Sequence, residues 1–385
     1  MNQAAAATNS QAREISSKGW WKWPVKEVLL SLILVIASHV FVVSFSRLAQ
    51  WERGSPAHLL GEYCQWDCGW YAQIIQSGYE SQPHAGGSHD AASWHFLPLF
   101  PLSAMPLSRW FGVAPGLAAV LASKFFLFTA ILSFLWMVRD DRDNLSDAVL
   151  AGKLVAFNPY VIYAHGGYAE SLYFTIAAAG FAFLSRERWV ASGLAGGLLS
   201  ATRIVGVAFV VPYVIASLRK YGISRLIRAQ RLDIFVGVLL CPAGLSLYLL
   251  YLYHLTGDAL APIHSFVDWG VTSGNPVAII GEGLRHGHWT RYWAWTAIVG
   301  WIASAWLAQQ RKIEMAVFLA LCILLPATAE VGGMPRFVWW QPPMLYAVFL
   351  LLKRYPRLQM IYAAFAGGMA ATMVFLWSIG SNAVV

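Results

Sequence analysis

The chain alternates long apolar stretches with short polar segments, most of them basic. About twenty consecutive apolar residues are enough to cross a bilayer as an α-helix. The pattern therefore predicts an all-α, polytopic membrane protein with about eleven transmembrane helices. The expected spans are 27–47, 116–138, 147–164, 168–184, two short spans within 189–218, 233–254, 292–309, 313–329, 337–352 and 358–379.

Two stretches fit this pattern poorly. Residues 189–218 are long for one span and short for two, although basic residues flank them on both sides. Two short spans that meet near Arg203 would satisfy these flanks, and so would a re-entrant hairpin. Residues 94–111 are expected to form either an interfacial helix or a further span.

The basic residues predict the orientation of the chain, because cytoplasmic loops of membrane proteins carry an excess of Lys and Arg. Residues 1–26 then form a cytoplasmic tail, and residues 27–385 form a single transmembrane domain. Segments 48–115 and 255–291 are expected to be outer loops, and the C-terminus lies on the same outer side. The run 27–47 lacks a small-residue cleavage site, so we expect a retained span and not a signal peptide.

Composition supports this assignment. The chain is 58% hydrophobic and only 12% charged, whereas about 25% of the residues in soluble domains are charged. The net charge of +8 comes largely from the loops assigned to the cytoplasm. The lipid bilayer is therefore the expected partner, and nucleic acid is not.

The most distinctive polar motif is WDCGWY at residues 66–71, soon after the first span. An acidic residue among aromatics on an outer loop is where a membrane enzyme would hold a base, whereas a transporter more often keeps its acid inside a helix. We therefore take Asp67 as the candidate general base, a role that needs hydrogen-bond contact with the reacting hydroxyl. The alternatives are a helix N-cap or an interfacial salt bridge.

Together with later motifs, this loop resembles the GPI mannosyltransferase II (PIG-V) family and its bacterial relatives. The family belongs to the GT-C glycosyltransferases, so the resemblance implies a GT-C-like fold over roughly residues 60–350. Two positions depart from the family pattern, because Cys68 replaces a small or apolar residue and His165-Gly166-Gly167 replaces Ser-Ala-Pro. The motifs that follow in family order are Gly78-Tyr79, FLPLFPL at 96–102, Asn158-Pro159, YAESL at 168–172, Arg188-Trp189, ATR at 201–203, GDAL at 257–260 and MPRF at 334–337.

The resemblance also implies an activity. Such enzymes take a sugar from a polyprenyl-phosphate carrier on the non-cytoplasmic face, which here implies a hexose, mannose by family, and a lipid-linked or envelope glycan as acceptor. A single displacement with Asp67 as base implies inversion at the anomeric carbon. No Walker-type phosphate loop is apparent in the sequence. Short loops favour a bacterial inner membrane, with the active site on its periplasmic face.

The leaving phosphate needs a fixed positive charge. Arg336 is the first candidate, because it follows Gly332-Gly333-Met334-Pro335 at the outer end of a span, where a forked guanidinium can grip a phosphate. Arg203 is the second candidate. Its alternative role is an internal ion pair with Glu170 or Asp258.

The remaining candidates would bind the acceptor or the sugar hydroxyls. His165, Tyr168 and Glu170 follow the third span, where two glycines allow a tight turn. Glu170 could equally be a structural acid, and Asp258 could simply end a helix. The full predicted substrate-binding set is Trp66, Trp70, Tyr71, His165, Tyr168, Glu170, Arg203, Asp258 and Arg336.

Histidine and cysteine positions predict no cofactor. His84, His89 and His95 share one loop and His286 and His288 another, but neither spacing matches a helix-borne zinc motif. A divalent metal is therefore not favoured. Cys64 and Cys68 flank Asp67, and at one helical turn apart we expect two thiols and not a disulfide. Cys241 and Cys322 are expected to be free and buried.

Other protein classes share some of these features. A secondary transporter would place its charges near the midplane on broken helices with internal repeats, and we find no repeat. A membrane acyltransferase would need an embedded histidine, for which His39 and His254 are the weak candidates. A scaffold would leave the polar residues of the outer face without a purpose.

Overall fold

The structure is a computed structural model that describes residues 25–52, 63–82, 92–224, 231–265 and 274–381. All regular elements of these residues are helices, which confirms the predicted all-α class. In chain order they are α2 (Val25–Glu52), α3 (Asp67–Ser77), η2 (Ser93–His95), α4 (Leu99–Phe111), α5 (Pro115–Met137), η3 (Arg139–Asp141), α6 (Leu145–Ala156), η4 (Val161–Ala164), α7 (Glu170–Ser185), α8 (Trp189–Ser200), η5 (Ile204–Phe209), α9 (Val210–Tyr221), α11 (Leu232–Leu240), α12 (Ala243–Thr256), α13 (Ala261–His264), α14 (Pro276–Arg285), α15 (His288–Gln309), α16 (Ile313–Ala327), α17 (Met334–Trp339), α18 (Pro342–Arg354) and α19 (Leu358–Ser378).

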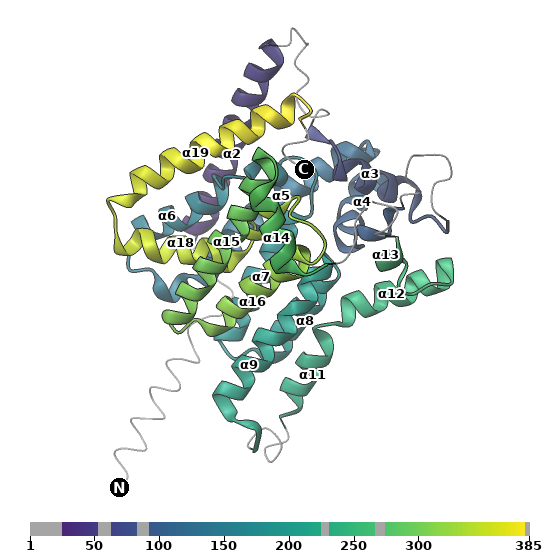
Figure 1. The fold of residues 1–385 in the computed structure, drawn as a ribbon, viewed down its shortest axis with the longest axis vertical. Helices are drawn as coiled ribbons and strands as arrows, with labels where there is room; N and C mark the ends of the chain where they lie inside the picture. Colours follow the sequence, from purple (N-terminus) through teal and green to yellow (C-terminus); the bar gives the residue numbers. More distant parts are fainter. Residues whose placement is uncertain (1–24, 53–62, 83–91, 225–230, 266–273, 382–385) are drawn as a thin grey trace.

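At the buried centre of the molecule α5 packs against α7, and α7 also packs against α8. Helices α2 and α19 pack side by side at one edge, and α12 extends to the opposite edge near α13 (Figure 1). Phe134 of α5 and Phe174 of α7 are fully buried and their rings touch at a centroid distance of 5.6 Å. These central helices hold the loops that carry the candidate site.

Several helices are long and apolar enough to cross a bilayer. Within the described residues these are α2, α5, the segment Ile204–Tyr221 and α19, and α11 with α12 qualifies as a pair bent by 44°. The chain is therefore an integral membrane protein. Helices α7, α8 and α16 are apolar but have only 10–17 residues, so the predicted number of eleven spans is not established.

Three predicted spans are each divided into two helices, and one of them is the span predicted at 233–254, which is α11 followed by α12. The span predicted at 147–164 is α6 followed by η4, and the span predicted at 337–352 is α17 followed by α18. A proline lies within or directly after each break, at Pro159, Pro242 and Pro342. Proline lacks the N–H that continues a helix and disfavours helical geometry in the residue before it. Hydropathy does not record this effect, so the continuous spans were a wrong prediction.

The two stretches that fitted poorly take defined forms. The chain breaks between α8 and α9 at Arg203, where we predicted that two short spans meet. Helix α4 has 13 residues and exposes Leu102, Trp110 and Phe111. Crossing the membrane takes about twenty residues, so α4 is suited to an interfacial position and is too short to be a further span.

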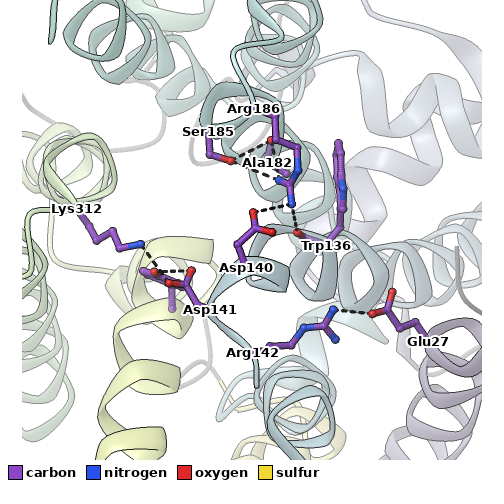
Figure 2. Close-up of polar contacts among 10 residues, drawn as sticks. Glu27, Trp136, Asp140, Asp141, Arg142, Ala182, Ser185, Arg186 and Lys312 are labelled. Carbon is purple, nitrogen blue, oxygen red and sulfur yellow. Dashed lines mark hydrogen bonds and ion pairs between the residues drawn. The ribbon is translucent and has the colours of Figure 1, made fainter. Parts of the chain in front are cut away.

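The basic loops meet at one end of the bundle, where ion pairs link them (Figure 2). Arg142 contacts Glu27 of α2 at 2.6 Å, and Arg186 at the end of α7 contacts Asp140 at 3.2 Å. Lys312, just before α16, lies 3.4 Å from Asp141. The loop around η3 thus contacts the ends of three helices through ion pairs, of which Arg142–Glu27 is the most buried.

Candidate active site

Asp67 lies at the first position of α3, directly after a residue with an unusual backbone conformation. Trp66 has φ 48° and ψ −115°, which L-residues with a side chain rarely adopt. Its indole packs edge-on against Trp377 of α19, with ring centroids 4.7 Å apart. Strained residues of this kind persist where the surroundings hold them, often at functional sites. The kink at Trp66 directs the Asp67 carboxylate toward α17.

Four charged side chains from distant parts of the sequence meet at Asp67. The Asp67 carboxylate lies 2.5 Å from Nη1 of Arg336, and Arg336 lies 3.9 Å from the Glu170 carboxylate. Glu170 in turn accepts a hydrogen bond of 2.6 Å from Arg203. We call Asp67, Arg336, Glu170 and Arg203 the Asp67 group. The ion pair between Arg203 and Glu170 was one of the alternatives predicted for Arg203.

Burial differs across the Asp67 group. The side chain of Glu170 is 2% exposed and that of Arg336 is 14% exposed, whereas that of Asp67 is 25% exposed. Buried charges are costly unless they are paired, and each of these charges has a partner. The Nε of Arg336 is also buried, with no hydrogen-bond partner in the described part of the chain. Arg336 therefore retains a free N–H donor beside Asp67, the more exposed of the two carboxylates.

Aromatic rings support the two arginines. The Arg336 guanidinium lies 5.5 Å from the ring centre of Tyr163 and 5.7 Å from that of Tyr168, and Arg203 lies 4.5 Å from the ring of Phe337. Gly333 has φ 64°, and a Cβ added there would lie 3.2 Å from Nε of Arg336. Glycine before α17 thus lets the guanidinium approach the backbone. Neither Tyr163 nor Phe337 was predicted as a site residue. Tyr163 is a buried aromatic in an apolar stretch, which carries no distinguishing signal, whereas Phe337 is the last residue of the MPRF motif.

The aromatic residues of the motif contact other rings of the protein. Tyr71 is buried against Phe96 and Phe100, and burial raises the pKa of its phenol above the ordinary value. Trp70 stacks on Phe96 at a centroid distance of 5.8 Å. The Tyr168 hydroxyl accepts a hydrogen bond from the Asp67 backbone N–H at 3.2 Å and donates one to the Gln65 carbonyl at 3.3 Å. Tyr168 thus holds the loop that carries Asp67.

His165 does not join Tyr168 and Glu170, contrary to the grouping we predicted. It is fully buried, and its ring nitrogens lie 3.0 Å from Lys124 and 3.0 Å from Ser38. The reason is local, since residues 161–169 form a short 3₁₀ turn and a loop. Residues three apart share a face in an α-helix but not in such a loop.

Asp258 also lies apart from the Asp67 group in its contacts. It pairs with His264 at 2.7 Å and accepts the backbone N–H of Leu260 at 2.8 Å. Hydrogen bonding to His264 lowers the pKa of the Asp258 carboxyl. Asp258 therefore links the end of α12 to α13, which agrees with the alternative of a helix-terminal residue.

Cys64 and Cys68 form a disulfide, so the expectation of two thiols was wrong. That expectation assumed that both residues lie on one helical turn. Cys64 instead precedes α3, and the kink at Trp66 brings the two Cα atoms to 5.0 Å, which is within the usual range for a bridge. The disulfide packs against two glycines: a Cβ at Gly116 would lie 3.0 Å from Cys64 Sγ, and one at Gly167 would lie 2.5 Å from Cys68 Sγ.

Substitution of Gly167 by Ala is expected to destabilise the site. The added Cβ would collide with the disulfide, and Gly167 has φ 77°, which alanine adopts only with strain. We expect a loss of about 1–3 kcal/mol in unfolding free energy, measured as a lower midpoint of thermal unfolding in detergent. G281A is the matched control, since a Cβ at Gly281 meets nothing within 4 Å. Equal midpoints for the two variants would contradict the proposed packing.

Metal ligands do not gather in the described part of the chain, where no group of three His, Cys, Asp or Glu residues could hold an ion. His84 and His89, which the sequence placed in one loop with His95, lie outside the described residues. Cys241 and Cys322 are free and buried, as predicted.

An apolar groove runs beside α3. It has a volume of about 630 Å³ and lies between α3 and α4 on one side and α8, α11 and α12 on the other. Ile74, two turns along the helix that begins at Asp67, lines it, and so does Ala201, two residues before Arg203. Its other lining residues are almost all apolar, with Tyr79, Tyr248 and Tyr251 as the polar exceptions. The groove is therefore suited to a hydrocarbon chain.

Comparison with known proteins identifies the fold. No family model and no curated protein matches the chain. Among solved structures, ArnT from Cupriavidus metallidurans bound to undecaprenyl phosphate is similar with a TM-score of 0.51 and 14% identity, covering 94% of this chain and 74% of ArnT. The Archaeoglobus fulgidus oligosaccharyltransferase, in complex with Zn and sulfate, has a TM-score of 0.51 and 13% identity, covering 90% of this chain. The chain spans about half of that oligosaccharyltransferase, 53% of its length. Both neighbours are GT-C proteins, and the chain described here has the GT-C fold.

Proposed function

We propose that the protein is a membrane glycosyltransferase that moves a hexose from a polyprenyl-phosphate sugar to a lipid-linked or envelope glycan. The observation that carries this proposal is the contact between Asp67 and Arg336, 2.5 Å apart. It places a carboxylate and a forked guanidinium at the start of a helix that borders an apolar groove. Such a transfer needs three parts: a carboxylate that can act as a base, a cation that binds phosphate, and a site for a hydrocarbon chain.

The proposed reaction is one displacement at the anomeric carbon. The acceptor oxygen forms a bond to this carbon while the bond between the carbon and the phosphate oxygen breaks. The acceptor proton passes to the Asp67 carboxylate, and the electron pair of the broken bond remains on the polyprenyl phosphate. The configuration at the anomeric carbon inverts.

Arg336 has two tasks in this mechanism. In the absence of substrate it neutralises Asp67, and with substrate bound its guanidinium would hold the leaving phosphate, for which Nε provides an additional donor. Opening of the Asp67–Arg336 contact frees the carboxylate to accept the proton. Glu170, with Arg203 behind it, keeps Arg336 in place. No metal is needed for these steps.

The structural neighbours support the choice of donor. The ArnT structure has undecaprenyl phosphate bound, and the second neighbour is an oligosaccharyltransferase. The similarity to PIG-V motifs favours mannose as the sugar. We also propose a bacterial inner membrane, which the short loops favour, with the site on the periplasmic face, opposite the basic loops.

The decisive experiment is transfer of radiolabelled mannose from synthetic polyprenyl-phosphate-mannose in membranes that contain the full chain. We expect label in a new glycolipid or glycan, and faster transfer from a long polyprenyl donor than from a short one because of the groove. Membranes without the protein are the control. The same membranes, formed into sealed vesicles, also test for protein-dependent uptake of labelled solute. Uptake without covalent transfer from mannosyl or other hexosyl donors would favour a transporter and contradict the proposal.

A further inference from the structure

A second polar cluster lies between α2, α5 and the loop before α7. We call Ser38, His39, Lys124 and His165 the Lys124 cluster. The Nζ of Lys124 lies 3.1 Å from Nδ1 of His39 and 3.0 Å from Nδ1 of His165. His165 Nε2 lies 3.0 Å from the Ser38 hydroxyl, and the rings of His39 and His165 stack at 5.9 Å. Within the described residues, none of these contacts joins the Lys124 cluster to the Asp67 group.

The hydrogen bonds determine where the protons lie in the Lys124 cluster. A lysine ammonium only donates, so Nδ1 of each histidine accepts, and Nε2 of each neutral ring carries its proton. His165 then donates to Ser38. The Nε2–H of His39 and the third N–H of Lys124 have no partner among the described residues, and no carboxylate there forms an ion pair with Lys124. The cluster thus combines one positive charge with two free donors.

The surroundings of the Lys124 cluster are apolar. His39 and Lys124 are half-buried, while Ile36 and Val40 beside His39 are 63% and 58% exposed and Phe125 beside Lys124 is 60% exposed. Exposed apolar side chains on these long helices are the surface that contacts lipid. Along the axis of α5, Lys124 lies about 13 Å from the first residue, at a rise of 1.5 Å per residue. Side chains of a helix tilt toward its N-terminus, so the Lys124 side chain extends toward this first residue. Its Nζ lies 5.1 Å from the ring centre of Tyr63.

An ammonium at a lipid-facing surface is unfavourable without an anionic partner. We propose that the Lys124 cluster binds the phosphate of a membrane lipid, at a site separate from the Asp67 group. Lys124 would supply the charge and His39 a second donor to a phosphate oxygen, while His165 and Ser38 orient Lys124 from the buried side. The apolar flanks favour a lipid over free phosphate, because they would contact its acyl chains. This inference does not depend on the sugar-transfer activity.

The test measures binding, so it is independent of transfer. Purified full-length protein in neutral detergent is titrated with phosphatidylglycerol, and native mass spectrometry counts bound lipids. We expect K124M to weaken the binding of one lipid by about tenfold, because a hydrogen bond to a charged group contributes more binding free energy than one between neutral groups. K153M is the matched control, because Lys153 also lies on an apolar helix but is exposed and forms no contact of this kind. H39Q should also weaken lipid binding, by a smaller factor, because His39 lies on the lipid-facing side.

Several outcomes decide between the sources of phosphate. Binding that depends on Lys124 and persists in excess inorganic phosphate supports a lipid site. The lipid assignment would be overturned if the wild type binds inorganic phosphate and K124M does not, while both proteins bind phosphatidylglycerol equally. Equal lipid binding by K124M and K153M would overturn the site altogether. Each variant must elute and melt like the wild type, and K124R, which keeps the charge, should retain binding.

Discussion

Substitution of Asp67 by Asn is expected to reduce sugar transfer by about 10²–10⁴-fold, the usual contribution of a general base. Asparagine has the same size and its amide oxygen can still accept a hydrogen bond from Arg336, but it cannot take up the acceptor proton. The donor KM should change little, because the phosphate-binding arginine remains. The measurement is kcat and KM for radiolabelled polyprenyl-phosphate-mannose in membranes with matched amounts of protein.

D140N is the matched control for this experiment. Asp140 lies at the other end of the bundle, its side chain is 75% exposed and its partner is Arg186, and such exposed pairs contribute little to stability. D140N should therefore transfer sugar like the wild type. If a folded D67N variant is as active as D140N, Asp67 is a structural residue and the proposed mechanism is wrong.

Substitution of Arg336 by Lys is expected to have the second large effect. Lysine keeps the charge but loses the planar fork, so it cannot contact Asp67, Glu170 and a phosphate in the same arrangement. We expect kcat/KM to fall by about 10²–10³-fold, as for the loss of one donor to a developing charge. Thermal unfolding should also begin at a lower temperature, because Glu170 is almost fully buried.

The control for Arg336 is R109K, which makes the same exchange at an exposed arginine of α4. This variant should match the wild type in rate and in unfolding midpoint. A double variant of D67N and R336K separates the contribution of the ion pair from those of its members. Losses that simply multiply would show that the two residues act independently, contrary to the proposal.

Hydropathy predicted the long helices and failed where the chain turns inside the bundle. Helices α2, α5 and α19 lie within a few residues of the predicted spans, because each is a long uninterrupted apolar run. The breaks at Pro159, Pro242 and Pro342 occur within apolar sequence. A buried turn is as apolar as the helices around it, so only the proline indicates it.

The members of the Asp67 group could be predicted, and the Arg203–Glu170 pair was one predicted alternative, but the pairing of Asp67 with Arg336 could not be predicted. Asp67, Glu170, Arg203 and Arg336 stand out as charges beside apolar spans, yet Asp67 and Arg336 are 269 residues apart. Only the packing of α3 against its neighbours brings them together. The disulfide was missed because the sequence does not reveal the positive φ of Trp66. His165 was misplaced because the sequence does not show which way a side chain in a turn points, and this one contacts Lys124 and Ser38.

The charges of the Asp67 group have a consequence for how substrate arrives. Two carboxylates and two guanidinium groups sum to zero, so the group creates little electric field at a distance. The Asp67 group itself would then contribute little to electrostatic steering, which can raise association rates by about 10–10³-fold, of the anionic donor that we propose. Delivery must rely on diffusion of the lipid within the plane of the membrane. The encounter rate should consequently be almost insensitive to ionic strength, and the arginines act only after the donor has reached them.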